Sequence, residues 1–143
     1  MGYDMTAEKF RRHVDDMADL VAPWLFQNPD VTHLVGRGVS GQLMLWPLAY
    51  KLGLNAMVVR KPNEDAHGKN NVGFGDMKNY AGVDDFIETG STIRAIVGGI
   101  DAQFRGQGRG DHEPRMKAII LYNERRDKPF GDWPDVPVFG KYP

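Results

Sequence analysis

Residues 80–92 read Tyr-Ala-Gly-Val-Asp-Asp-Phe-Ile-Glu-Thr-Gly-Ser-Thr, and we expect the rest of the chain to be arranged around them. The first four residues predict a modest strand that runs into two adjacent acids, Asp84 and Asp85. The stretch from Thr89 to Thr92 then opens a predicted helix. Unpaired backbone N–H groups and the positive end of the helix dipole converge at such a helix start and favour an anion. Because Gly90 also lets the backbone approach closely, the pattern predicts a phosphate-binding loop.

Two carboxylates directly before a phosphate loop need a separate reason, because they would repel a bare phosphate. A ligand that carries both a phosphate and a vicinal diol removes the conflict, since carboxylates accept hydrogen bonds from the hydroxyls. A ribose 5-phosphate has that shape. The plain alternative is an acidic turn before a helix with ordinary caps.

The run from Val83 to Thr92 resembles the signature of the type I phosphoribosyltransferases, which is an apolar strand, two acids, two apolar residues, a variable residue and Thr-Gly-Gly/Ser-Thr. The resemblance implies transfer of a 5-phosphoribosyl group from 5-phosphoribosyl 1-diphosphate (PRPP) to a nitrogen nucleophile, usually a nucleobase. Diphosphate is released, and Mg²⁺ is expected on it as the cofactor. In this assignment Asp84 and Asp85 hold the ribose hydroxyls, and the 5-phosphate is held by Thr89, Gly90, Ser91 and Thr92.

Glu88 occupies the variable position of the signature. In the family's 6-oxopurine enzymes an acid stands there and faces the imidazole nitrogen of the purine. The resemblance therefore implies a hypoxanthine-, guanine- or xanthine-type acceptor, with Glu88 as a catalytic residue. A glutamate that merely faces solvent is the alternative. Asn123 departs from this pattern, because those enzymes often carry a lysine at that point.

The run Gly36-Arg-Gly-Val-Ser-Gly41 follows a short apolar strand predicted at Val31 to Val35 and precedes a helix. It matches Gly-x-Gly-x-x-Gly literally, so a dinucleotide loop is one interpretation. A plain tight turn is another. In the resembling family a comparable turn binds the donor's diphosphate, which would assign that role to Arg37 and Gly38.

A second apolar strand, predicted at Asn55 to Val59, ends in Arg60 and Lys61, which the resemblance places beside the diphosphate. The hydrophilic stretch 63–79 is too long for an ordinary connection and is typical of a mobile lid. Residues 60–68 look like the mobile loop of orotate phosphoribosyltransferases, so His67 and Lys69 are expected to cover the diphosphate. An exposed loop without a function is the alternative.

Alternating strands and helices predict an α/β fold, with an open, Rossmann-like parallel sheet flanked by helices. Its sites are expected at the carboxyl ends of the strands. The stretch 123–143, named here the C-terminal hood, is predicted to be short and irregular. Its Trp133 is expected either to stack on the base or to plug the edge of the sheet. We predict helices at 6–21, 42–52 and 92–104, and further strands at 80–83 and 116–122. Thr6 is the expected N-cap of the first helix, Pro23 and residues 28–30 are expected to stop it, and Pro47 is expected to interrupt the second helix.

A length of 143 residues suits a single domain, here 1–143. The formal net charge of −1 gives no general attraction to nucleic acid, and no apolar run approaches membrane-spanning length. The absence of cysteine makes a cytoplasmic location the default expectation. The resemblance adds that a homodimer is common.

Other functions compete with a purine phosphoribosyltransferase. One is an orotate-type phosphoribosyltransferase, and another is a regulatory module that binds PRPP or a nucleotide without catalysis. A dinucleotide-dependent oxidoreductase using residues 36–41 is a further possibility, but it leaves residues 84–92 unexplained.

Overall fold

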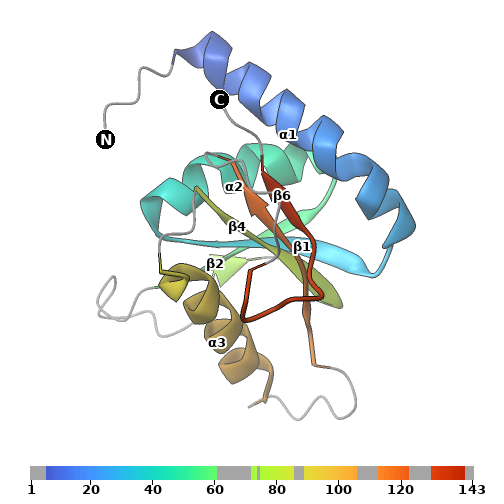
Figure 1. Cartoon of the computed structure of the whole chain (residues 1–143), viewed down its shortest axis with the longest axis vertical. Coiled ribbons are helices and arrows are strands. Elements are labelled where there is room, and N and C mark those ends of the chain that lie inside the picture. The colour runs from blue at the N-terminus through green and yellow to red at the C-terminus, as the bar shows by residue number, and fades with distance from the viewer. Residues whose placement is uncertain are drawn as a thin grey trace.

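A mostly parallel sheet forms the centre of the computed structural model, which describes residues 6–60, 72–73, 75–85, 89–105, 113–122 and 130–140 (Figure 1). Within these residues the sheet has six strands in the order β3-β2-β1-β4-β5-β6. Neighbouring strands are parallel except for β2 and β3, which are antiparallel. The strands are β1 (Val31–Arg37), β2 (Asn55–Val59), β3 (Val72–Gly73), β4 (Asn79–Asp84), β5 (Met116–Leu121) and β6 (Val138–Gly140).

Helices cover both faces of the sheet. The helices α1 (Ala7–Gln27) and α2 (Gly38–Leu52) pack on one face, and α3 (Ser91–Arg105) packs on the other (Figure 1). Successive strand residues point to opposite faces, so Leu34 joins the α1/α2 core and Val35 joins the α3 core. The α/β fold with an open sheet and flanking helices is therefore as the sequence predicts.

Prolines do not end the first two helices, contrary to the prediction for α1. Thr6 caps α1 as expected, because its Oγ1 accepts from the Lys9 N–H at 3.2 Å, but Pro23 lies inside a helix that continues to Gln27. Proline removes one hydrogen bond to the carbonyl four residues earlier. That residue, Asp19, is exposed, so water can hydrate its carbonyl. Packing of Trp24 and Leu25 against the core favours continuation.

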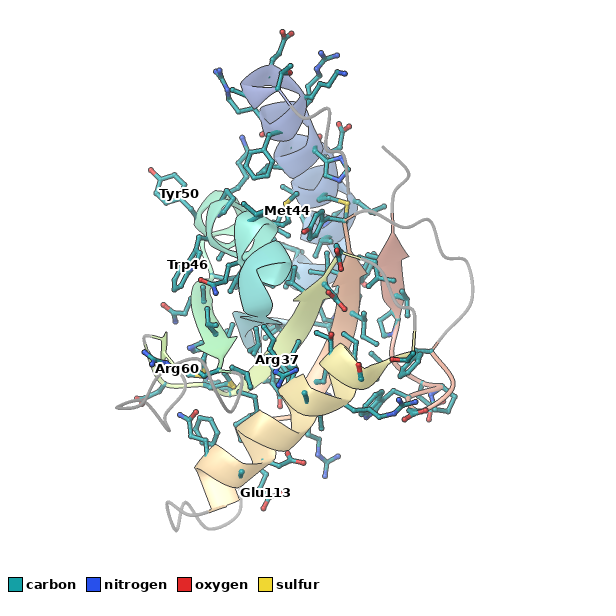
Figure 2. All side chains as sticks on the ribbon, turned by 90° about the vertical axis from the view of Figure 1, so that its left-hand side faces the viewer. Arg37, Met44, Trp46, Tyr50, Arg60 and Glu113 are labelled. Atoms are coloured by element: carbon teal, nitrogen blue, oxygen red, sulfur yellow. The ribbon has the colours of Figure 1, made fainter. Side chains whose placement is uncertain are left out.

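The helix α2 begins at Gly38, four residues before the predicted Gln42, and includes Pro47. Its inner side is buried at Met44, whereas Leu43, Trp46 and Tyr50 are exposed. Figure 2 shows Trp46 and Tyr50 on the outer side of the helix.

Two predicted irregular regions contain short strands. The predicted lid at 63–79 includes β3, which pairs with β2, and its last residue begins β4. The C-terminal hood contains β6, which extends the sheet beside β5. These strands have only two and three residues, too few for a periodic pattern to show in the sequence. Among the described helices, none combines the length and apolar character needed to cross a membrane.

Candidate functional site

The strands β1 and β4 are parallel neighbours whose connections leave in opposite directions. Val35 pairs with Gly82, so both strands end at the same edge of the sheet. The chain passes from β1 into α2 on one face and from the end of β4 toward α3 on the other (Figure 1). In open α/β sheets, ligands bind outside the carboxyl ends of the strands at such a switch point. The candidate site is therefore at this edge.

Asp84 and Asp85 stand at the end of β4 as predicted, and both are buried, with exposed fractions of 6% and 8%. The Asp84 Oδ1 atom accepts the backbone N–H of Asp85 at 2.8 Å. The Asp84 carbonyl accepts the backbone N–H of Tyr122, at the end of β5, at 3.1 Å. The backbone at the two acids is thus held by one hydrogen bond between them and by another to the residue that follows β5.

The loop at the start of α3 depends on Gly90. Its φ of +84° lies in the left-handed region, which favours glycine. Thr89 Oγ1 donates to Ser91 Oγ at 3.2 Å and accepts the Ser91 N–H at 3.3 Å, which closes a tight turn. Thr89 and Ser91 are exposed and Thr92 is half-buried. Hydroxyl groups and the helix N-terminus therefore meet at residues 89–92, a combination that can hold a phosphate.

Arg37 is a cation at this edge of the sheet. It ends β1 on the same face as Val35, that of α3, and Figure 2 shows it between the sheet and α3. Its Nε atom is buried and has no hydrogen-bond partner among the described residues. Gly38 follows, buried and with a φ of +74°. A buried guanidinium nitrogen that still needs an acceptor fits an anionic ligand such as a diphosphate.

Several predicted site residues cannot be placed with these. Arg60 is half-buried and follows β2, which lies on the side of β1 away from β4, and Figure 2 shows it apart from Arg37. Four predicted residues lie outside the described residues, namely Lys61, His67, Lys69 and Glu88. Their roles stay predictions.

Trp133 is half-buried and packs against the core on the α3 side. Its ring stacks on Phe130, with centroids 5.6 Å apart and planes at 26°. One face of the indole is therefore covered by protein, which favours the packing alternative. Contact of Trp133 with a base remains a prediction.

Arg94 and Asp132 are two residues of this region that the sequence did not reveal. Arg94 Nε and Nη2 donate to the two carboxylate oxygens of Asp132 at 2.6 and 3.2 Å. This bond lowers the pKa of Asp132 and raises the pKa of Arg94. A signal did exist in the sequence, because a basic residue in the first turn of a helix is unfavourable unless an acid compensates it.

No group of three or more His, Cys, Asp or Glu side chains within the described ranges could hold a metal ion. A magnesium ion at this edge would therefore take most of its ligands from a bound diphosphate and water, which suits its preference for oxygen.

Searches of protein-family models and of curated protein sequences find no match to this chain. Solved structures do match. An adenine phosphoribosyltransferase from Thermoanaerobacter pseudethanolicus is 18% identical, covering 94% of this chain and 80% of its own, with a TM-score of 0.60. An orotate phosphoribosyltransferase from Aeropyrum pernix is 16% identical, covering 94% and 71%, with a TM-score of 0.65. The adenine phosphoribosyltransferase of Saccharomyces cerevisiae, in complex with an imino-altritol bisphosphate and adenine, is 21% identical, covering 94% and 80%, with a TM-score of 0.60.

Proposed function

We propose that this chain, which has the fold of the type I phosphoribosyltransferases, transfers the 5-phosphoribosyl group of PRPP to a nucleobase and releases diphosphate. One observation carries the proposal. Two buried carboxylates at the end of β4 precede a glycine loop at a helix start, beside a buried arginine nitrogen that has no hydrogen-bond partner among the described residues. The names of the similar structures agree with this chemistry, since they are adenine and orotate phosphoribosyltransferases.

In this reaction the chain's own residues bind and orient the donor. Asp84 and Asp85 accept hydrogen bonds from the ribose hydroxyls and so align the anomeric carbon. Residues 89–92 hold the 5-phosphate. Cleavage at the anomeric carbon develops oxocarbenium character, and the departing diphosphate gathers negative charge. Arg37 and Gly38 stabilise that charge, together with Arg60 and Lys61.

Magnesium, when bound to the diphosphate, supplies further positive charge to the leaving group. His67 and Lys69 are proposed to cover the diphosphate while the bond breaks. This role is supported only by the likeness of their loop to that of orotate phosphoribosyltransferases.

The base is proposed to be a 6-oxopurine, on the strength of Glu88 alone. A carboxylate at that position could manage the proton of the imidazole ring as N9 attacks. Adenine and orotate remain the competing acceptors, since the similar structures include enzymes named for both.

A diphosphate-release assay with PRPP, Mg²⁺ and a panel of bases tests the reaction and its acceptor. The panel should contain hypoxanthine, guanine, xanthine, adenine and orotate. We expect turnover with a 6-oxopurine. Turnover with adenine or orotate alone would keep the reaction class and overturn the base assignment, whereas no release with any base would overturn the reaction.

Replacing Glu88 distinguishes an effect on turnover of the base from an effect on binding of the donor. Glu88→Ala should impair turnover of the base about 100-fold, the range typical of a lost general acid or base. The donor affinity, measured by calorimetry, should stay close to that of the wild type. Equal losses in both would contradict the assigned role of Glu88.

A regulatory module that binds PRPP or a nucleotide without catalysis is the second candidate. It is favoured by the stacking of Trp133 on Phe130, which occupies an aromatic ring otherwise available to a base. Donor binding by calorimetry without turnover of any base would favour this function. A single-domain organisation, a homodimer and a cytoplasmic location also remain proposals. Sedimentation of the purified chain tests the dimer.

A further inference from the structure

The guanidinium of Arg94 joins three parts of the chain. Its Nη1 atom donates to the carbonyl of Thr89 at 2.9 Å, inside the loop before α3. Its Nε and Nη2 atoms donate to the carboxylate of Asp132 in the C-terminal hood, and its Cζ lies 5.5 Å from the centroid of the Phe130 ring. Arginine suits this arrangement because its planar fork can serve a carboxylate in bidentate fashion while another N–H reaches a carbonyl.

Gly90 and Phe130 form a second connection between the same two parts. A Cβ atom added to Gly90 would lie only 2.2 Å from Cζ of Phe130, so the ring rests directly on the glycine backbone. Phe130 is buried, with 8% exposed, and Trp133 stacks on its ring. The Trp133 N–H also donates to the Phe130 carbonyl at 2.9 Å, which ties residues 130–133 into one turn.

These contacts connect the loop and the hood turn twice. Arg94 links the Thr89 carbonyl to Asp132, and Phe130, from the same turn as Asp132, packs on Gly90. The Arg94 side chain belongs to the first turn of α3, where its positive charge opposes the helix dipole. The charge of Asp132 compensates for this. A basic residue at this position does not stabilise α3 by itself, so helix stability alone does not explain Arg94.

We propose that Arg94 and Asp132 are positioning residues that lock the Thr89–Gly90 backbone to residues 130–133 of the C-terminal hood. The loop and the hood turn then keep one geometry, and the anion-binding amides at the start of α3 are held ready for the ligand. The identity of that ligand as a 5-phosphoribosyl group rests on the proposed function. The contacts that form the lock do not depend on the proposed function.

Amide hydrogen exchange of the ligand-free protein tests the lock without any ligand. Asp132→Asn keeps the shape of the side chain but removes its charge, and Arg94→Met removes all three hydrogen bonds. Both should speed the exchange of residues 89–94 about five- to tenfold. Arg94→Lys should give an intermediate value, because an ammonium cannot reproduce the bidentate fork.

Asp15→Asn is the matched control. Asp15 pairs with Lys51 at 3.1 Å and joins α1 to α2, far along the chain from the loop. This variant should leave the exchange of residues 89–94 unchanged.

Calorimetry with ribose 5-phosphate and with PRPP adds the functional arm. Asp132→Asn should weaken ribose 5-phosphate about fivefold, at the lower end of typical coupling between sites. If the wild type binds neither compound while exchange still responds to Asp132→Asn, the lock stands and the proposed function fails. If Asp132→Asn and Arg94→Met exchange and bind like Asp15→Asn, the lock is wrong whatever the wild type binds.

Discussion

The two carboxylates at the end of β4 differ in the contacts that they make within the protein. Asp84 has a structural role besides its proposed contact with the ribose, because its Oδ1 atom also accepts the Asp85 N–H. Asp85 is the better probe of function. Asp85→Asn should lower kcat/KM for PRPP about 10- to 100-fold, because one charge-assisted hydrogen bond contributes roughly 1.5–3 kcal/mol. Initial rates of diphosphate release measure it.

Asp19→Asn is the control for this change, because Asp19 is an exposed acid of α1. Its activity should match the wild type. If Asp85→Asn keeps full activity in a protein that turns over PRPP, the diol assignment is wrong.

His13 connects α1 to the edge that carries the site. It is buried, its Nε2 is hydrogen-bonded to the Tyr122 carbonyl, and its ring meets that of Tyr122 edge-on. His13→Phe should lower the free energy of unfolding by about 1–3 kcal/mol, because the carbonyl would lose its donor inside the protein. Urea unfolding measures the change.

A residue on the same helix provides the comparison for His13. Arg12 forms an exposed pair with Glu8 at 3.4 Å, so Arg12→Ala should cost no more than about 0.5 kcal/mol. Equal effects of the two substitutions would show that the bond from His13 contributes nothing.

At the scale of elements, the sequence predicts those features that depend on neighbours in the chain. The strand Asn55–Val59 and the cap at Thr6 are as predicted, because an apolar run and an N-cap hydroxyl act locally. Arg94 in the first turn of α3 indicates that an acid must compensate it, but the sequence does not show which one, because Asp132 lies 38 residues away. The end of α1 was missed because tertiary packing outweighs the loss of one hydrogen bond at Pro23, whereas the predicted end of α2 at Leu52 is correct and only its start at Gly38 was missed.

The pair Gly98-Gly99 in α3 offers a test of local propensity against packing. A Cβ on Gly98 would meet nothing within 4 Å, so Gly98→Ala should stabilise the protein by about 0.5–1 kcal/mol. A Cβ on Gly99 would fall 2.6 Å from Cγ1 of Val59 and 3.3 Å from its Cγ2. Gly99→Ala should therefore destabilise by about 1–3 kcal/mol, since a branched side chain in β2 cannot move aside.

Thermal or urea unfolding of both variants decides between the two effects. The substitutions are chemically identical and adjacent, so each serves as the control for the other. Stabilisation by both would mean that α3 can shift away from β2 at little cost.

At the scale of the whole molecule, the order of the strands explains why distant residues meet. Residues 37–38 and 84–85 are separated in the chain by α2, β2 and β3, yet they share one edge because β1 and β4 are neighbours. The general rule for parallel sheets predicts this edge, and the structure places Arg37, Gly38, Asp84 and Asp85 there, while their roles stay predictions. The sequence could not predict which side chains close over the site, because those contacts depend on how the C-terminal hood returns to α3.

Tyr80 makes the stability of the whole molecule sensitive to alkaline pH. Its hydroxyl is buried, has no hydrogen-bond partner in the described part of the chain, and has a pKa raised above its usual value by burial and then by the charge of Asp101. The folded state thus holds a proton that the unfolded state loses above about pH 10, so this contribution is complete below pH 10 and falls as the pH rises further. Tyr80→Phe should flatten that fall and add about 1 kcal/mol at pH 8, because it removes an unpaired buried hydroxyl. Urea unfolding from pH 8 to 11 measures both effects, with Tyr50→Phe, at a 90% exposed tyrosine, as the control without effect. A loss of stability at pH 8 would show that the Tyr80 hydroxyl is hydrogen-bonded after all, and an alkaline slope equal to that of the wild type would show that its ionisation does not cause the fall.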